Sequence, residues 1–401
     1  MLMKTIEAKD YCSFVTDGTH DSPKPQTEGR YLVTSKHLNR FQLDFQSAYF
    51  ISEEDFQKII ARSSVEQWDI LFSMIGTIGN IYIETNPTVE YACKNMGIFK
   101  MGGDSQKAKW LFYYLQSPKA KEYIAGVARG TTQGYVPLGA LRTLPIEVPS
   151  DDERKKIVQV LWNLDKKILI NQTINKNLLQ QLRFIFSHWF TDNPQIESIR
   201  QIPLNEVCTI VTKGTTPTTL GKKFVPKGIN FIKAESILDN HSIDKNKFAF
   251  IDTETNDLLK RSIIKDGDIV FTIAGSLGRF ALIDSSVLPA NTNQAVAIIR
   301  ANRNLVEPEY LYSFFVGNWH NDYYTKRIQQ AVQANFSLGT IKSLPILILP
   351  NESMKNYLET IGPIIKMTKD NEIEITKLEN IRDILLPKLM SGELDVSNIT
   401  V

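Results

Sequence analysis

The sequence has few cysteines and no long apolar run, and each absence excludes a class of protein. Its three cysteines, Cys12, Cys93 and Cys208, are too few and too scattered for a disulfide framework or a CxxC metal site. They indicate buried thiols in a reducing cytoplasm, so we expect a cytoplasmic protein. No run approaches the roughly 18 apolar residues of a membrane span, and the N-terminal MLMKTIEAKD lacks the apolar core of a signal peptide. We therefore expect neither secretion nor membrane insertion.

The residue patterns of several enzyme classes are also missing. The five histidines are never closer than His20 and His37, so there is no HxxxH metal pair. The segments MIGTIGN (74–80) and IAGSLGRF (273–280) lack the GxGxxG pattern and are typical of tight turns after strands. NPTVEY (86–91) and DNPQ (192–195) each have one proline where an amino-methyltransferase site needs two. We expect no catalytic residue, no metal and no cofactor.

Charge gives little indication of a partner, because a formal net charge of +2 on 401 residues says nothing about a local surface. With 42% hydrophobic residues the chain is long enough for two to three globular domains.

An internal duplication dominates the sequence. CSFVTDGTH (12–20) parallels CTIVTKGTT (208–216), EQWDILFSMIGTIGN (66–80) parallels KDGDIVFTIAGSLGR (265–279), and LGALRTLPIEVPS (138–150) parallels LGTIKSLPILILPN (338–351). The offset stays between 196 and 200 residues, so the order of elements is kept and insertions are few. This is a tandem repeat.

Within each half the pattern of apolar residues changes once. Short apolar runs punctuated by Gly, Pro and Asn, such as DILFSMI and AVAIIR, indicate strands and loops, with helical patches between them. After Pro149 and Pro350 the apolar period changes to about 3.5 residues, and Ser150 or Asn351 supplies a helix N-cap. We predict α+β globules over residues 1–150 and 203–350, long helices over 151–192 and 351–396, a linker at 193–202 and a tail at 397–401.

The two long helices should pair with each other as an antiparallel coiled coil. The apolar stripe from Ile157 to Trp189 and the weaker one from Tyr357 to Leu389 each need a partner to leave water. The alternative is that each helix packs only on its own globule. A pseudo-twofold relation between the halves would make the helices antiparallel. Pro363 and Pro387 should bend or interrupt the second helix.

Asn171 and Asn371 lie near the middles of these helices and are repeat equivalents. We predict that they face each other close to the twofold axis and fix the register, as buried asparagines do in other coiled coils. The alternative is that they are two unrelated polar positions. A separation along the helices of more than about one turn, roughly 5 Å, excludes the predicted register.

The layout resembles the specificity subunit of a type I restriction-modification enzyme over essentially the whole chain. The matching segments are LPIEVPS (144–150), LPILILP (344–350), DDERKKIVQVLWNLD (151–165), LRFIFSHWF (182–190) and LLPKLMSGELDV (385–396). No single motif is diagnostic, but their order together with the duplication is specific. In that family each of two target-recognition domains reads one half of a bipartite, asymmetric target in double-stranded DNA.

The resemblance also implies partners. The helices set the spacing between the half-sites and dock modification subunits, which the layout suggests are two, while methylation of adenine and cleavage belong to modification and restriction/translocase subunits. The chain itself would be non-catalytic. One alternative is the specificity component of a related multi-subunit methyltransferase without restriction, and another is a pseudo-symmetric protein-binding scaffold. DNA binding that weakens steeply with salt separates the first two from the third.

Two kinds of segment are candidate DNA contacts. Residues 207–234 contain five lysines, several threonines and no acid, which suits phosphates, although a solvated loop has the same composition. The loops ARGTTQGYVP (128–137) and QAVQANFSLG (330–339) offer amides and a guanidinium for base edges, or equally for turns and caps. Asn95 and Gln294 are further candidates. The predicted contacts are Lys36, Arg129, Thr131, Thr132, Gln133, Tyr135, Lys213, Thr215, Thr216, Thr218, Lys222, Lys223, Lys233, Gln333 and Asn335.

The loops differ more between the halves than the frameworks do, so we expect two different half-sites. For the modification subunits we predict a docking surface on the outer face of the helices that includes Trp162, Phe186 and Trp189. Packing of these aromatic side chains against their own globules is the alternative.

Overall fold

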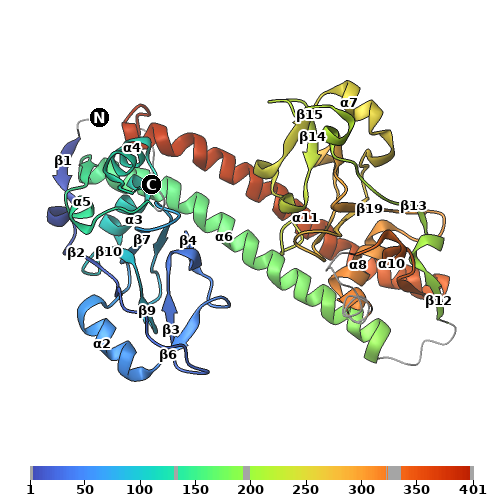
Figure 1. Ribbon diagram of the computed structural model, residues 1–401, viewed down its shortest axis with the longest axis horizontal. Coiled ribbons are helices and arrows are strands. Elements are labelled where there is room, and N and C mark those ends of the chain that lie inside the picture. The colour runs from blue at the N-terminus through green and yellow to red at the C-terminus, as the bar shows by residue number, and fades with distance from the viewer. Residues whose placement is uncertain (1–2, 131–133, 193–198, 322, 324–335, 398–401) are drawn as a thin grey trace. The chain divides into compact units, whose positions relative to one another are not determined.

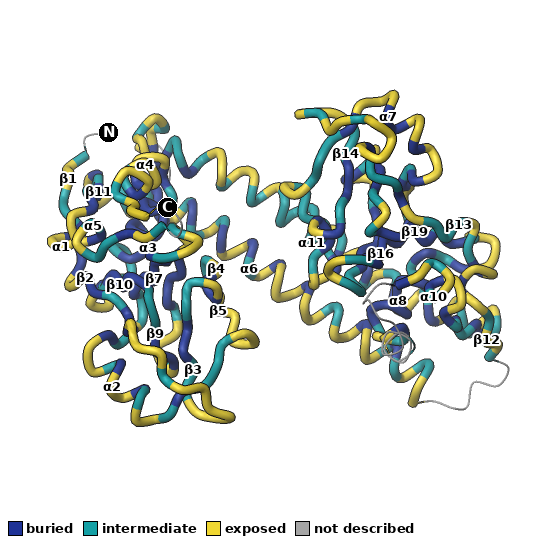
Figure 2. Tube along the Cα trace, viewed as in Figure 1, coloured by how far each residue is buried: buried dark blue, intermediate teal, exposed yellow. Residues whose placement is uncertain are grey.

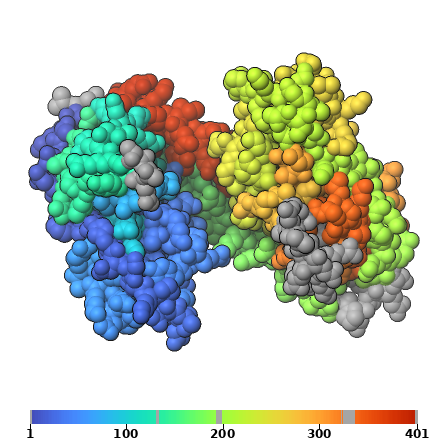
Figure 3. All heavy atoms as spheres, in the orientation of Figure 1, coloured from blue at the N-terminus to red at the C-terminus, as the bar shows by residue number. Residues whose placement is uncertain are grey.

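The computed structural model describes residues 3–130, 134–192, 199–321, 323 and 336–397 (Figure 1). The chain forms two compact units. Unit 1 comprises Met1–Lys167 and Leu378–Val401, and unit 2 comprises Ile168–Lys377. Each unit therefore contains one globule and parts of both long helices. In unit 1 the N-terminal residues, blue to turquoise, pack with the red C-terminal residues into one body (Figure 3).

Unit 1 is built on a four-stranded sheet of order β2-β10-β7-β8 and a three-stranded sheet of order β6-β3-β9, with two-stranded pairs β1-β11 and β4-β5. The strands are β1 (Lys4–Glu7), β2 (Phe14–Asp17), β3 (Arg30–Val33), β4 (Leu38–Asn39), β5 (Gln42–Leu43), β6 (Tyr49–Ile51), β7 (Ile70–Ser73), β8 (Ile81–Ile83), β9 (Tyr91–Cys93), β10 (Met96–Lys100) and β11 (Pro145–Val148). The helices are α1 (Ala8–Tyr11), η1 (Ser35–His37), α2 (Glu53–Ser63), α3 (Ser105–Tyr114), α4 (Pro118–Val127) and α5 (Leu138–Arg142).

Unit 2 repeats this topology with sheets β13-β19-β16-β17, β15-β14-β18 and β12-β20. The strands are β12 (Arg200–Pro203), β13 (Cys208–Lys213), β14 (Ile229–Ile232), β15 (Ala249–Ile251), β16 (Ile269–Thr272), β17 (Phe280–Leu282), β18 (Ala290–Thr292), β19 (Val296–Ala301) and β20 (Pro345–Ile348). The described helices are η3 (Leu204–Glu206), η4 (Pro217–Leu220), η5 (Ala234–Ser236), η6 (Lys245–Lys247), α7 (Thr253–Leu258), η7 (Lys260–Ser262), η8 (Ser285–Val287), α8 (Pro308–Val316) and α10 (Leu338–Lys342). The predicted repeat of two α+β globules is confirmed.

The central strands are the short apolar runs of the sequence. All four residues of β7 and of β16 are buried, and β16 and β19 are dark blue in Figure 2. The aspartate before each strand is fully buried and paired: Asp69 lies 2.9 Å from Lys100 Nζ, and Asp268 accepts two bonds of 2.7 Å from Arg300. Burial raises the pKa of Asp69 against the opposing effect of Lys100. These repeated ion pairs join the start of β7 to the end of β10 and the start of β16 to β19.

The long helices are α6 (Asp151–Ser187), followed by a π-helical segment η2 (His188–Asp192), and α11 (Asn351–Ser391). Ser150 caps α6 reciprocally with Glu153, as predicted from its position before the apolar period. The prolines were predicted to bend or interrupt the second helix; interruption is wrong, because α11 continues through both Pro363 and Pro387, and bending stays a prediction. Pro363 is exposed, so water can satisfy the carbonyl that loses its partner.

Within each unit the two helix segments run antiparallel. In unit 2 Asn371 Nδ2 donates to Asn175 Oδ1 at 2.8 Å, and Asn171 Nδ2 donates to Glu374 Oε2 at 2.7 Å, so rising numbers on α6 face falling numbers on α11. Asn171 and Asn371 therefore do not pair with each other as predicted, and the partners observed are displaced by about one helical turn, which is the limit set for the predicted register. The prediction aligned the two helices at their midpoints and did not include their packing on the globules. The buried Asn171 instead has a carboxylate partner, which gives a stronger hydrogen bond than an amide does.

Packing on the globules also shifts the buried stripe of α6. Asp165 is buried where a strict 3.5 period places Leu164, and Phe186 is buried where it places Ile185. A straight α-helix has 3.6 residues per turn, so a stripe that packs on a globule drifts from the coiled-coil positions.

A charged cluster joins the end of α11 to the rest of unit 1. The Asp165 side chain is 2% exposed and accepts hydrogen bonds from Arg382 at 3.0 Å, Arg40 at 2.9 Å and Tyr113 at 2.8 Å. The repeat-equivalent positions in unit 2 are the buried Ile365 and Leu182. One half thus uses an ion pair where the other uses apolar contact.

Two buried histidines lie in unit 2 among aromatic rings. His241 stacks on Phe280 with centroids 4.0 Å apart, and His320 meets the edges of Phe271 and Phe280. Burial lowers the pKa of each to about 4, with Arg183 adding to the effect on His241. Both rings are therefore neutral in the folded unit at neutral pH.

Candidate nucleic-acid interface

Loops gather at one end of the four-stranded sheet in each unit. Both β2 and β7 run antiparallel to β10, so the loops after Asp17 and Ser73 emerge where β10 begins at Met96. In unit 2 the loops after Lys213 and Thr272 emerge where β19 begins. We call this place the loop end of the sheet. Topology therefore brings together segments that lie far apart in the sequence.

A glycine lets the first of these loops cross close to the chain before the central strand. A Cβ atom on Gly18 would lie 2.4 Å from Cys93 O, and one on Gly214 would lie 1.9 Å from Thr292 O. Both distances are far inside van der Waals contact, so only glycine fits without moving the backbone. The crossing explains why DGT and KGT keep their glycine in both halves.

In unit 1 the crossing places four side chains together. His20 Nδ1 lies 2.8 Å from Asn95 Oδ1, and His20 Nε2 lies 3.0 Å from Asp17 Oδ2. Arg62, from the end of α2, donates to Gly18 O at 2.9 Å and lies 3.4 Å from Asp17 Oδ1. His20 and Arg62 are exposed. We call these residues the strand-exit cluster of unit 1.

Unit 2 has an equivalent cluster of different chemistry. Thr216 Oγ1 donates to Gln294 Oε1, and Gln294 is exposed. Arg261 donates to Lys213 O at 3.4 Å and to Thr215 Oγ1 at 3.3 Å. Thr215 and Thr216 are thus predicted contacts that the structure brings together with Gln294. These residues form the strand-exit cluster of unit 2.

The two arginines were missed by the sequence interpretation. Each precedes a buried serine, Ser63 or Ser262, whose hydroxyl bonds the preceding helical turn. The repeated Arg-Ser pair, with serine inward and arginine toward the loop, was the signal that could have found them.

The second predicted contact loop lies at the same end of the sheet. Arg129 and Tyr135 exchange two backbone hydrogen bonds of 2.8 Å, both residues are exposed, and Tyr135 also bridges to Ile75 in the loop after β7. The loop is anchored by a bond of 2.8 Å from Val136 N to Met74 O. In unit 2 Phe336 N makes the same bond to Ile273 O at 3.0 Å. Five predicted contacts lie outside the described residues: Thr131, Thr132, Gln133, Gln333 and Asn335.

The lysines of residues 207–234 differ in their surroundings. Lys222 pairs with Glu254 at 2.7 Å, and this hydrogen bond raises its pKa. Lys233 lies 3.6 Å from Glu235 and over the ring of Phe224. Lys213 and Lys223 are exposed, and neither has an acidic partner within 4 Å among the described residues.

The remaining predicted contacts are also at the surface. Thr218, in η4, is exposed, and so is Lys36, in η1 directly after β3. Val33, the last residue of β3, pairs with Cys93, which lies three residues before β10 begins at Met96. The end of β3, and Lys36 after it, therefore lie toward the loop end of the sheet.

The glycine turns after β7 and β16 are tight turns, as predicted. Gly76, Gly79, Gly275 and Gly278 have positive φ, and the hydroxyls of Ser73 and Thr272 bond backbone atoms across the turns. Each turn belongs to a hairpin in the four-stranded sheet, which accounts for its glycines without a nucleotide.

The aromatic side chains predicted to dock partners each pack against their own unit. Phe186 is 2% exposed and packs on Phe314 at 5.0 Å, and Trp189 lies 5.4 Å from Tyr357. Trp162 packs on Phe41 and lies under Lys109. The prediction is wrong for Phe186, which is buried because the end of α6 packs on the globule. Trp162 and Trp189 are half-buried, so their docking role stays a prediction.

Other apolar side chains of the helices are exposed. Phe184 on α6 is 72% exposed in unit 2, and Ile384 on α11 is 61% exposed in unit 1. They are repeat equivalents, 200 positions apart. Ile170 and Ile174 lie on the same face of α6 as Phe184 by helical spacing, and both are exposed. Phe184 and Ile384 are the matched pair, because the positions equivalent to Ile170 and Ile174 are Asp370 and Glu374.

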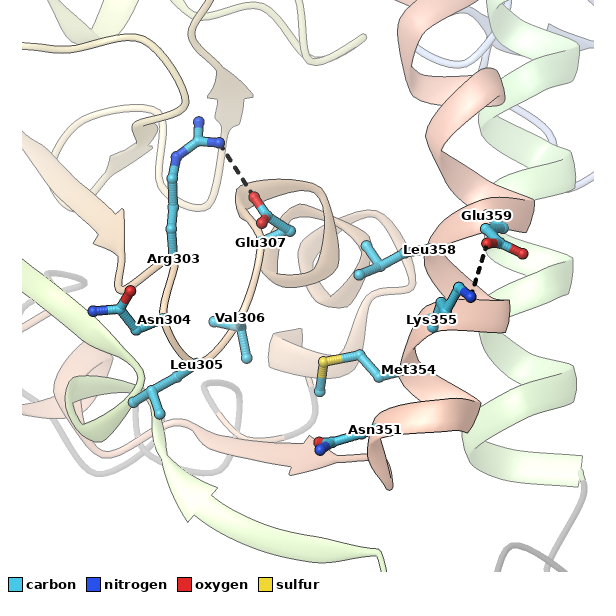
Figure 4. A pocket seen from close by; sticks show the side chains of 10 residues that line it. All are labelled: Arg303, Asn304, Leu305, Val306, Glu307, Asn351, Met354, Lys355, Leu358 and Glu359. Atoms are coloured by element: carbon cyan, nitrogen blue, oxygen red, sulfur yellow. Dashed lines mark hydrogen bonds and ion pairs between the residues drawn. The ribbon is translucent and has the colours of Figure 1, made fainter.

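Two surface grooves hold no convergent polar site. In unit 2 a groove of about 490 Å³ lies between residues 303–307 and the start of α11, where Arg303 pairs with Glu307 and Lys355 with Glu359 (Figure 4). In unit 1 a groove of about 640 Å³ includes Arg40, already engaged by Asp165. The charged groups of the first groove are paired with each other, and in the second groove Arg40 is paired while the exposed Lys121 is the remaining charged side chain.

Within the described part of the chain, no three His, Cys, Asp or Glu side chains are arranged to hold a metal ion. No described helix is both long and apolar enough to cross a membrane.

Comparison with known proteins follows the same two-part layout. The family model for the type I restriction modification DNA specificity domain matches residues 26–180 and 197–380, which together make up most of the chain. The MjaIX specificity subunit of Methanocaldococcus jannaschii is 22% identical over 349 residues, covering 82% of this chain and 78% of that protein. The HindI specificity subunit of Haemophilus influenzae is 20% identical over 421 residues, covering 83% and 88%.

A solved structure has the same fold. The crystal structure of the type I restriction-modification S subunit from M. genitalium aligns with a TM-score of 0.53 at 16% identity, covering 97% of this chain and 96% of that one. Two tandem matches to one family model, each falling on one of the repeated globules, account for the duplication. The chain therefore belongs to the type I restriction modification DNA specificity family and is a DNA specificity subunit.

Proposed function

We propose that each unit presents the loop end of its sheet to one half of a bipartite target in double-stranded DNA, and that the two half-sites differ. The observation that carries this proposal is that equivalent loops occupy the same end of the same sheet in both units but differ in side chains. A shared framework with different loops suits one mode of binding and two sequences.

Phosphate contacts supply most of the affinity in this proposal. The exposed Lys213 and Lys223, with Thr218 beside them, face no acid within 4 Å among the described residues and suit the DNA backbone. In unit 1 Lys36 and Arg129 take this role, with the aromatic Tyr135 beside the loop. Lys222 and Lys233 contribute less, because each already lies near a glutamate.

The salt dependence of DNA binding tests the proposal. The double variant Lys213→Ala/Lys223→Ala should weaken binding to all sequences alike, because lysine–phosphate contacts carry no sequence information. The slope of log affinity against log salt should become shallower by about 2. Fluorescence anisotropy of labelled duplexes with the full chain in its native complex measures both. Lys355→Ala, an exposed lysine of α11 paired with Glu359, is the control and should leave the slope unchanged. An unaltered slope in the double variant contradicts the assignment.

We further propose that the chain is non-catalytic and acts with partner subunits. The long helices hold the two recognition surfaces at a set spacing and dock modification subunits, with restriction/translocase subunits joining the full complex. Phe184 in unit 2 and Ile384 in unit 1 occupy equivalent positions, which suits two copies of one partner.

Charge substitution at these positions tests the docking surface. Phe184→Asp and Ile384→Asp should each weaken binding of one modification subunit, because a carboxylate cannot be desolvated in an apolar interface without a partner. The double variant should lose both copies. Native mass spectrometry of the co-expressed complex counts the copies. Leu258→Asp, which changes an exposed apolar residue of α7 outside the long helices, is the matched control. A full complement of partners in the double variant would remove this surface from consideration.

A further inference from the structure

We infer that the held amides of the strand-exit clusters, Asn95 with His20 in unit 1 and Gln294 with Thr216 in unit 2, are the specificity-determining pairs of the two half-sites. This inference rests on the proposed function, since it names the residues that read bases within the same surface. Arg62 and Arg261 are the positioning residues that hold each loop against its sheet.

The two amides occupy one place in the fold. Asn95 is the last residue before β10, and Gln294 lies in the connection between β18 and β19. Each is joined to the loop that leaves the first strand of the sheet, through His20 or Thr216. This contact depends on the close approach of Gly18 to Cys93 and of Gly214 to Thr292. The backbone therefore brings the loop and the amide together in both units, although the side chains differ.

The hydrogen bonds orient the amides without exhausting them. His20 Nδ1 is hydrogen bonded to Asn95 Oδ1, and Thr216 Oγ1 donates a hydrogen bond to Gln294 Oε1. A carboxamide oxygen accepts two hydrogen bonds and its nitrogen donates two. Each amide therefore retains the donor and the acceptor with which Asn or Gln contacts adenine in the major groove. An amide held in this way loses less side-chain freedom on binding than a free one.

Charge at the clusters is compatible with a polyanion. Asp17 is the acid within the unit 1 cluster, and both Arg62 and His20 lie against it. Arg62 remains 59% exposed on its side chain, so its guanidinium can also reach a phosphate. In unit 2 the corresponding residue is Lys213, which adds a positive charge.

The two pairs differ in reach and in chemistry. Gln294 is one methylene longer than Asn95, and its neighbour is a hydroxyl rather than an imidazole. Two surfaces of the same shape thus present different groups to the DNA, which produces an asymmetric target from a duplicated fold.

Mapping of methylated sites tests the inference with the full chain in its native complex. Gln294→Ala should relax the preference at one base position of one half-site by about tenfold and leave the other half-site unchanged. Asn95→Ala should do the same for the opposite half-site only. Gln57→Ala and Asn304→Ala, exposed amides outside the clusters, are the controls and should keep the wild-type target. Circular dichroism melting of each variant verifies the fold.

The outcomes separate this inference from the proposed function. If the wild-type complex methylates a defined sequence and both variants keep it at every position, the inference is overturned while the proposed function stands. A uniform loss of methylation over all sequences also overturns it, because it assigns the amides to affinity rather than to reading. If the wild-type complex shows no sequence preference, the proposed function fails first.

Discussion

Replacing Asp165 by alanine is expected to destabilise unit 1 by about 3–5 kcal/mol, because it leaves two arginines without their shared carboxylate in a largely buried place. Arg382 is 12% exposed on its side chain and Arg40 is 25% exposed. Neither guanidinium can lose its proton, so the charge cannot be removed by titration. Tyr113 also loses its acceptor at 2.8 Å.

The repeat provides a matched test of this ion pair. The double variant Asp165→Ile/Arg382→Leu installs the residue types that unit 2 has at Ile365 and Leu182. It should be less destabilised than Asp165→Ala, because it leaves only Arg40 without its carboxylate, whereas Asp165→Ala leaves both Arg40 and Arg382 without theirs. Hydrogen exchange with mass spectrometry under increasing urea localises the effect to unit 1. Glu54→Ala, which removes a fully exposed pair with Lys58, should leave the protection of unit 1 nearly unchanged. Equal protection in wild type and Asp165→Ala would refute the role of the cluster.

Unit 2 is expected to lose stability as the pH falls below neutrality. His241 and His320 have pKa values of about 4 in the folded unit, below the ordinary value of 6.5, because burial disfavours the charged ring. The folded state therefore binds fewer protons than the unfolded state below pH 6.5. Their stabilising contribution is complete above that pH and is lost progressively between about pH 6.5 and 4. At pH 5 the loss is about 2 kcal/mol for each ring.

The groups around His241 act in the same direction or only partly oppose it. Arg183, His320 and Lys369 lower its pKa further, while Asp239 raises it. Calorimetry or hydrogen exchange of unit 2 peptides from pH 7.5 to 5 measures the effect. The double variant His241→Phe/His320→Phe should flatten the pH dependence, whereas His188→Gln, an exposed histidine of η2, should not. A wild-type unit 2 equally stable at pH 7.5 and 5 would contradict the assignment.

Local patterns in the sequence predicted much of this fold. The alternation of short apolar runs and turn residues predicted the strands, and glycine spacing predicted the hairpin turns after β7 and β16. The repeat itself predicted two globules of the same topology. These features depend on residues that are close in the sequence. Because the chain is duplicated, the same pattern indicated each of them twice.

The candidate site was predicted only in part. Thr215, Thr216, Lys213 and Arg129 were identified from composition and do lie at the loop ends. Arg62 and Arg261 were missed, because their contact with the loop depends on a helix that returns to the sheet from over 40 residues away. The spacing of residues along the sequence does not indicate which distant helix will contact a given loop.

The sequence by itself determined the duplication, the order of elements and the positions where the long helices begin. Only the tertiary structure decided how the helices align and which of their side chains are buried. The physical reason is that a helix has several nearly equivalent registers, one turn apart, and distant contacts select among them. Within unit 2 the end of α6 packs on the globule through Phe186 and Phe314, and Asn371 meets Asn175 in the register that this packing accompanies.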